Sequence, residues 1–310
     1  MGLNVLNPFK YPIMKKNNLS TTILASVLIV TITLVNLSCK KDRIELPEEL
    51  NEYQSVNDYL NSKKQDEQTF EITGPSNDTI VGNQGTRIYG MKSCLRDVNG
   101  DTIDYPFNIH LVELYTPKDM IYWQMPTIAN GNVLETDGEV RIRSTKNGQE
   151  LNLNCPFSFE MPNGAPNSNM TIFKGTDNGT FVDWANTGNS FTYTSYGYLG
   201  ATSSFGWLNA DIQIANPSSS TISFTSLTDN LTNVGIFIYI PTTKTVMQVY
   251  NLTSGALPNG TDIKVILMAQ NASNQLFSYT ESRTTNVNTT ITVSLNVTTD
   301  TDLTTYLDAL

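Results

Sequence analysis

Near Thr69 the apolar pattern of this chain changes to a period of two residues and keeps it until about residue 300, which strongly limits the possible folds. Beyond this point apolar and polar residues alternate over short runs, as they do in half-buried β-strands. Turn dipeptides such as Asn99-Gly100, Asn130-Gly131 and Asn147-Gly148 separate the runs. No long helical pattern interrupts the series. The sequence therefore predicts an all-β fold of the sandwich or barrel type.

A Pro/Asn/Gly-rich cluster at residues 161–169 divides the predicted strands into two sets. Clusters of this composition mark loops and linkers. We therefore place a domain boundary here, with one β-sandwich domain over residues 67–162 and a second over residues 163–310. The length of the chain also favours two domains over one large core.

Short helices are expected at both ends of this β-rich region. Apolar residues within 47–65 fall near helical spacing and predict one short helix before the first strand. Residues 300–310 show the same spacing and predict a small terminal helix, with Thr299 or Asp300 as its N-cap.

The stretch from Met14 to Cys39 resembles a bacterial lipoprotein signal. Lys15 and Lys16 precede an apolar run from Ile23 to Leu37, and the run stops at Ser38-Cys39. This order of charged, apolar and small residues is typical of an export signal. The resemblance implies cleavage before Cys39, a lipid on its thiol and attachment of the protein to a membrane.

Residues 1–13 do not fit such a signal, and we interpret them as an over-long gene start with Met14 as the true first residue. Residues 39–66 would then form a lipidated tether followed by the short helix. A transmembrane anchor is the rival interpretation, but the apolar run is shorter than the roughly 20 residues that cross a bilayer. An ordinary secretory signal is a further alternative.

The charge of the chain limits the partners it can bind. The formal net charge is −10, and the first 38 residues contain Lys10, Lys15 and Lys16 but no acidic residue. The processed chain is therefore more acidic still. Nucleic acid and anionic lipid would be repelled. We expect no nucleic-acid partner.

Two cysteines are left after Cys39 is acylated. Cys94 and Cys155 both lie in the predicted first domain, each near a strand end. In an oxidising compartment they could form a disulfide, or both could be buried free thiols. Neither has a second Cys or a His at ligand spacing, so a metal site is not expected.

Chemistry-bearing motifs are scarce. His110 is the single histidine, and by strand alternation it lies opposite Ile109 and Leu111, where we expect an exposed or edge side chain. No nucleophile-elbow, zinc-protease or P-loop pattern occurs. A carboxylate pair of the glycosidase type would have to use acids such as Glu113, Glu135 and Asp137, but no motif singles these residues out. We expect no catalytic residues, no cofactor and no enzymatic activity.

Asp97, Asn99 and Asp101 have the oxygen spacing of a calcium loop. The segment lacks the following glycine and the distal glutamate of an EF-hand. Asn-Gly is also a strong hairpin-turn signal, so a plain turn is the favoured interpretation and a calcium site the weaker one.

Aromatic residues are dense between residues 184 and 207. If the rings are exposed, with Asn and Asp nearby, they would form a platform for a sugar; if they alternate inward, they fill a core. The candidate platform comprises Trp184, Tyr193, Tyr196, Tyr198 and Trp207.

Three motifs resemble those of an uncharacterised group of Bacteroidota lipoproteins. They are the Asp78–Thr86 segment DTIVGNQGT, the Asn130–Gly138 segment NGNVLETDG after a strand ending in acid, and the Phe205–Asp211 segment FGWLNAD. The resemblance covers about residues 67–310. It implies two β domains, the first similar to ZU5-like or carboxypeptidase-regulatory-like sandwiches, and it brings no activity. The segment Tyr89–Leu95 departs from the group's pattern.

These observations predict a non-enzymatic, lipid-anchored binding or scaffold protein of the outer membrane, most simply at the cell surface. The periplasmic face is an open alternative, because the mixed charges of residues 40–46 fit both a surface-routing signal and a plain tether. A glycan or an envelope protein would be the partner. Two alternatives are a glycan-binding accessory lipoprotein of a polysaccharide uptake system and a fimbrial subunit.

Overall fold

The computed structural model describes residues 49–75, 79–178, 181–215 and 218–310. Residues 49–310 form one compact unit. Strands make up 50% of the structure, and the described residues hold three short α-helices. The predicted all-β class is confirmed.

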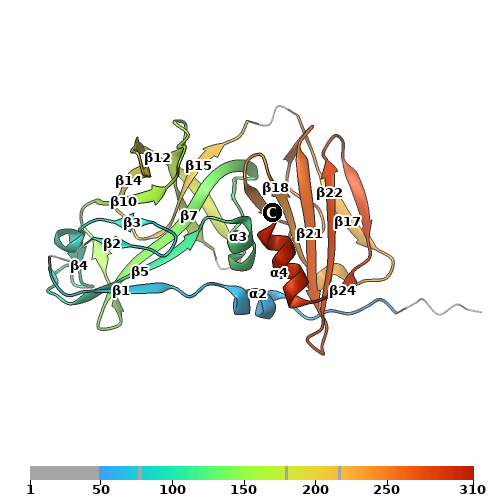
Figure 1. Cartoon of the computed structure of the whole chain (residues 1–310), viewed down its shortest axis with the longest axis horizontal. Helices are drawn as coiled ribbons and strands as arrows, with labels where there is room; N and C mark the ends of the chain where they lie inside the picture. The colour runs from blue at the N-terminus through green and yellow to red at the C-terminus, as the bar shows by residue number, and fades with distance from the viewer. Residues whose placement is uncertain (1–48, 76–78, 179–180, 216–217) are drawn as a thin grey trace, which may run out of the picture. The chain divides into compact units, whose positions relative to one another are not determined.

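The first group of strands forms two sheets that pack face to face (Figure 1). The larger sheet is antiparallel and has the order β1-β5-β7-β15-β11-β12, with β6 and β8 also paired to β7. Its strands are β1 (Gln68–Ile72), β5 (Phe107–Leu114), β6 (Ile128–Ala129), β7 (Asn132–Lys146), β8 (Gln149–Glu150), β11 (Thr171–Asp177), β12 (Val182–Ser190) and β15 (Gly206–Gln213).

The facing sheet has the order β13-β14-β10-β3-β2. One apolar core lies between the two sheets and includes Ile109 and Ile142 from one, and Phe159 and Tyr198 from the other. A short pair of strands, β4 with β9, flanks this sandwich. The strands are β2 (Ile80–Val81), β3 (Arg87–Ile88), β4 (Leu95–Arg96), β9 (Asn152–Leu153), β10 (Phe157–Pro162), β13 (Thr192–Tyr193) and β14 (Gly197–Thr202).

The second group of strands follows residue 218 and has its own core. Its main sheet has the order β19-β18-β21-β22-β24; β17 and β23 form a parallel pair, and β16 pairs with β20. The strands are β16 (Ser219–Ser220), β17 (Ile222–Ser226), β18 (Gly235–Ile240), β19 (Thr245–Gln248), β20 (Leu257–Pro258), β21 (Asp262–Gln270), β22 (Leu276–Thr284), β23 (Thr289–Val293) and β24 (Asn296–Thr298).

The expected domain boundary between residues 162 and 163 is wrong. Strand β10 before it pairs with β14 after it, and β15 pairs with β7. The cluster at 161–169 connects a strand of one sheet to a strand of the facing sheet. Because a crossing between two sheets needs the same turn-rich composition as a linker, the sequence pattern did not distinguish them. The first strand group ends with β15, and the second begins with β16.

Three helices join the two strand groups: α2 (Asn57–Lys63), α3 (Pro117–Trp123) and α4 (Asp300–Asp308). Figure 1 shows them between the strands of the two groups. Their apolar residues share one cluster with both groups; it includes Leu60, Ile121, Leu307, Phe173 and Ile266. The two groups therefore meet through a common core.

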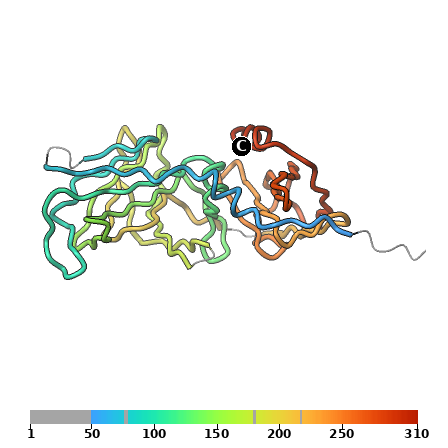
Figure 2. Tube along the Cα trace, turned by 90° about the horizontal axis from the view of Figure 1, so that it is seen from below, coloured from blue at the N-terminus to red at the C-terminus, as the bar shows by residue number. Residues whose placement is uncertain are grey.

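The helix expected over residues 47–65 is shorter than predicted, while the C-terminal helix is confirmed. Residues before Asn57 are extended instead, with bridges from Asn51 to Asp229 and from Gln54 to Gln270. Figure 2 shows this segment running along the second strand group. In α4, the Thr299 hydroxyl caps the helix by accepting a hydrogen bond from the Asp302 N–H.

The buried carboxylate of Asp229 holds this extended segment. It accepts hydrogen bonds from the Tyr53 hydroxyl at 2.6 Å and the Asn51 side chain at 3.1 Å. Further bonds come from the Thr228 hydroxyl and the Leu295 N–H. Burial raises the pKa of Asp229, but these hydrogen bonds outweigh it and lower the pKa to about 2.

We expect the Asp229→Asn variant to lose about 2 kcal/mol of unfolding free energy at pH 7. The folded-state pKa lies below the unfolded one, so this contribution is complete above about pH 4 and disappears as the pH falls toward about 2. Urea unfolding at pH 7 and pH 2.5 measures it. The exposed Asp104, changed to Asn, is the control. A loss of equal size at both pH values would contradict the assignment.

Candidate ligand-binding groove

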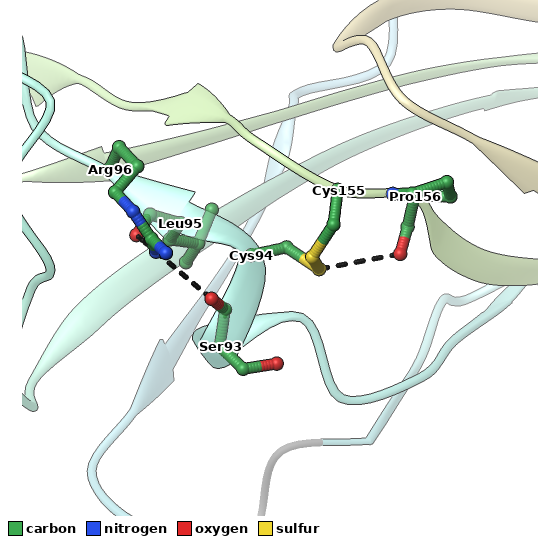
Figure 3. The surroundings of a disulfide bond; sticks show 6 residues. All are labelled: Ser93, Cys94, Leu95, Arg96, Cys155 and Pro156. Carbon is green, nitrogen blue, oxygen red and sulfur yellow. Dashed lines mark hydrogen bonds between the residues drawn. A yellow bond between two sulfur atoms is a disulfide. The ribbon is translucent and has the colours of Figure 1, made fainter.

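Several residues named from the sequence have structural roles. Cys39 lies outside the described residues. Cys94 and Cys155 form a disulfide with a Cα–Cα distance of 5.0 Å, across 61 residues of sequence. Figure 3 shows that the bond joins the turn before β4 to the segment before β10, beside the Pro156 carbonyl.

His110 is not exposed, contrary to the expectation. It does lie opposite Ile109 and Leu111, but β5 is an inner strand, and only 8% of the residue is exposed. Its Nδ1 is 3.0 Å from the Thr69 hydroxyl and its Nε2 is 2.8 Å from that of Thr145. Burial, followed by the charge of nearby arginine, lowers the pKa of the imidazole. The neighbouring strands β1 and β7 supply these partners, which a single-strand pattern could not show.

The Asp97 segment has the geometry of a turn. One Asp97 oxygen accepts hydrogen bonds from the Asn99 and Asp101 N–H groups, both at 2.9 Å. These backbone hydrogen bonds lower the pKa of Asp97. Within the described ranges no group of three or more His, Cys, Asp or Glu residues could hold a metal ion.

Glu113 explains the glycine-rich motif before it. Its carboxylate accepts hydrogen bonds from the N–H groups of Gln84 and Thr86, both at 2.8 Å. A Cβ at Gly82 would lie 2.5 Å from the same carboxylate. The motif and the acid at the end of the strand therefore form one structural unit, in which Glu113 caps the loop.

The other two candidate carboxylates also bind protein groups. Glu135 accepts a hydrogen bond from Asn167. Asp137 accepts one from the Tyr198 hydroxyl at 2.5 Å and pairs with Lys244 at 2.6 Å.

The predicted aromatic platform does not exist as one surface. Trp184 and Trp207 belong to the core shared with the second strand group, whereas Tyr198 belongs to the sandwich core. Tyr196 is half-buried under Arg87, and Tyr193 is 40% exposed. Trp184 and Trp207 lie on β12 and β15 of the larger sheet, whereas Tyr198 lies on β14 of the facing sheet, so the rings are divided between two cores.

A different set of residues forms a surface feature that we call the junction groove. It consists of three adjoining hollows. The first, the tryptophan hollow, has a volume of about 330 Å³ and is lined by Trp123, Trp207, Lys64, Arg141 and Phe181 among others. The second, of about 340 Å³, is apolar and contains Phe181, Met247 and Tyr250. The third, of about 390 Å³, is lined by Asn57, Gln124, Gln248 and Tyr250 among others.

Shared residues make the three hollows continuous. Phe181 lines the first and second, Gln124 the first and third, and Tyr250 the second and third. Phe181 and Tyr250 are 37% and 45% exposed, and their ring centroids are 5.7 Å apart. Gln124 ends helix α3 in a left-handed conformation with φ 54°, an uncommon geometry for a residue other than glycine.

The tryptophan hollow combines aromatic rings with positive charge. The rings of Trp123 and Trp207 meet edge to face at 5.7 Å. The guanidinium of Arg141 is 5.4 Å from both ring centroids, and Lys64 Nζ is 5.1 Å from that of Trp123. Burial, followed by the charge of Arg141, lowers the pKa of Lys64. Arg141 is also paired with Glu67 at 3.0 Å.

Sequence reasoning missed this site because its residues come from distant segments. Lys64 follows α2, Trp123 ends α3, Arg141 lies on β7 and Tyr250 follows β19. The one local signal is Thr116-Pro117, a typical cap and first residue of a helix, which would have placed Trp123 at a helix end.

No family model matches the chain, and no curated protein or solved structure is significantly similar to it. None of the helices in the described part of the chain is long and apolar enough to cross a membrane.

Removing the disulfide tests its contribution to the fold. We expect the Cys94→Ala/Cys155→Ala double variant to lose about 3 kcal/mol of unfolding free energy, because the bond closes a long loop in the unfolded chain. Urea unfolding of the oxidised protein and the variant measures the difference. Equal stabilities, with two free thiols in the wild type, would show that the bond does not form.

Proposed function

We propose that this protein is a non-enzymatic, lipid-anchored binding protein of the outer membrane, and that an oligosaccharide binds in its junction groove. The observation that carries the proposal is the tryptophan hollow, where the half-buried Trp123 lies beside Lys64 and Arg141 and packs against the buried Trp207. Aromatic rings bury the apolar faces of sugars, and the two cations and nearby amides can bind sugar oxygens.

The form of the groove favours a chain-like ligand. Its three hollows extend from the tryptophan pair to the exposed pair Phe181 and Tyr250. The amide side chains of Gln124 and Gln248 also line the groove. Adjoining hollows lined by rings and amides suit successive sugar units better than a single compact molecule.

Lys64 and Arg141 further favour a sugar unit that carries a carboxylate. Both cations are half-buried, so solvent screens a carboxylate beside them less than at an exposed lysine, although Glu67 already pairs with Arg141. The rest of the chain is acidic, so long-range attraction of a highly charged polymer is not expected, and contacts over a few ångströms decide binding.

The fimbrial alternative requires an N-terminal strand that can be exchanged. β1 is an edge strand, which fits this mechanism. The segment before it is tied to Asp229 by Tyr53 and Asn51, which counts against release. Oligosaccharide binding is therefore the stronger candidate.

Binding is tested with an array of bacterial and dietary oligosaccharides, followed by calorimetry on the best acidic ligand. We expect Trp123→Ala to weaken binding at least tenfold, as for a buried aromatic contact. Lys64→Ala should weaken binding of the acidic ligand about fivefold and leave binding of its carboxyl-reduced form unchanged. Tyr193→Ala is the matched control, because this exposed ring lies outside the groove. Binding that Trp123→Ala leaves intact would contradict the groove assignment.

Anchoring is tested separately with a Cys39→Ala variant. We expect the wild type to sediment with outer membranes and the variant to appear in the soluble fraction, because the lipid is the only attachment we propose. Protease treatment of intact cells then distinguishes the cell surface from the periplasmic face. Sedimentation of both proteins would contradict anchoring through Cys39.

A further inference from the structure

A buried cluster of two acids and one amide lies beside the groove but takes no part in it. Glu139 on β7 is directly opposite Asn209 on β15. Asp211 follows after a β-bulge and is opposite Thr136. All three of Glu139, Asn209 and Asp211 have 0% exposure. We call them the acid–amide cluster.

The polar atoms of this cluster have no protein partners. Both carboxylate oxygens of Glu139 and of Asp211 lack a hydrogen bond within the described residues, as do both amide atoms of Asn209. Thr136 and Asn209 lie close enough to Asp211 to lower its pKa, but neither makes a hydrogen bond of ordinary geometry to it. An unpartnered buried carboxylate is strongly unfavourable.

Residues of the second strand group cover the cluster. The Thr136 N–H donates to the Thr243 carbonyl at 3.0 Å, and the Thr245 hydroxyl donates to the Leu134 carbonyl at 2.5 Å.

We infer that the acid–amide cluster is a binding site for a hard divalent cation, calcium in the first place. Two carboxylates balance the charge of the ion, and the Asn209 carbonyl adds a neutral oxygen. Calcium prefers such all-oxygen sets, whereas zinc prefers nitrogen and sulfur. Magnesium usually retains several water molecules, which an enclosed site does not favour. The ion would lock the bulge between β7 and β15 beneath the second strand group.

This site is separate from the Asp97 turn, where a side-chain oxygen already serves two N–H groups of the turn. It is also independent of the proposed function, since no residue of the cluster lines the tryptophan hollow.

The test begins with the full processed chain, refolded either with EDTA or with calcium and then dialysed. We expect about one calcium per chain in the calcium sample, and a melting temperature higher by roughly 5 °C than with EDTA. Magnesium at the same concentration should have a much smaller effect. No bound calcium, together with equal melting temperatures, would overturn the inference.

Variants locate the effect. Glu139→Gln and Asp211→Asn should each abolish the calcium-dependent rise in melting temperature, whereas the matched control Asp101→Asn should retain it. With EDTA, Glu139→Gln should be at least as stable as the wild type, because it removes an unpartnered buried acid. A calcium response that persists in Glu139→Gln, or that is lost in Asp101→Asn, would overturn the assignment.

Terbium luminescence gives a readout that needs no variant of the cluster. Trp207 lies two residues before Asn209 on the same strand, so it should sensitise a terbium ion bound at the cluster. We expect a signal that calcium displaces and that Asp101→Asn retains. No sensitised signal from the wild type after refolding with terbium would count against the site.

Discussion

One shared apolar cluster determines how the rest of this molecule is arranged. The helices α2, α3 and α4 have only seven, seven and nine residues, too few to be stable alone. They persist because Leu60, Ile121 and Leu307 are buried between the two strand groups. Each such side chain contributes about 1.5–3 kcal/mol through burial. The same cluster therefore stabilises the helices and fixes the two strand groups against each other.

The junction groove is a consequence of that packing. Helix α3 ends at Trp123, and Gln124 turns the chain in a left-handed conformation. Strand β7 presents Arg141 to the same tryptophan, and the region after β19 adds Tyr250. The Thr127 N–H donates to the Val246 carbonyl and the Val246 N–H donates to the Thr127 hydroxyl, and these bonds hold the two walls together. A groove built on such packed elements is preorganised, so little conformational entropy is lost when a ligand binds.

Buried acids of this chain differ in the hydrogen-bond donors that the protein gives them. Glu113 caps a glycine-rich loop through its N–H groups. Asp229 holds the N-terminal segment through hydroxyl and amide donors. Glu139 and Asp211 have no such donors within the described residues. The contrast supports an external partner for the third group, because the first two show that this fold supplies donors wherever a carboxylate is structural.

The sequence by itself determined the class of the fold and the features that depend on neighbouring residues. The period of two identified the strands, and Thr299 marked the start of the C-terminal helix. The domain boundary, the environment of His110 and the division of the aromatic rings between two cores were decided by tertiary structure. So was the groove, which joins Lys64, Trp123, Arg141 and Tyr250. The physical reason is range: alternation and capping act over a few residues, whereas sheet order and burial depend on contacts between segments far apart in the chain.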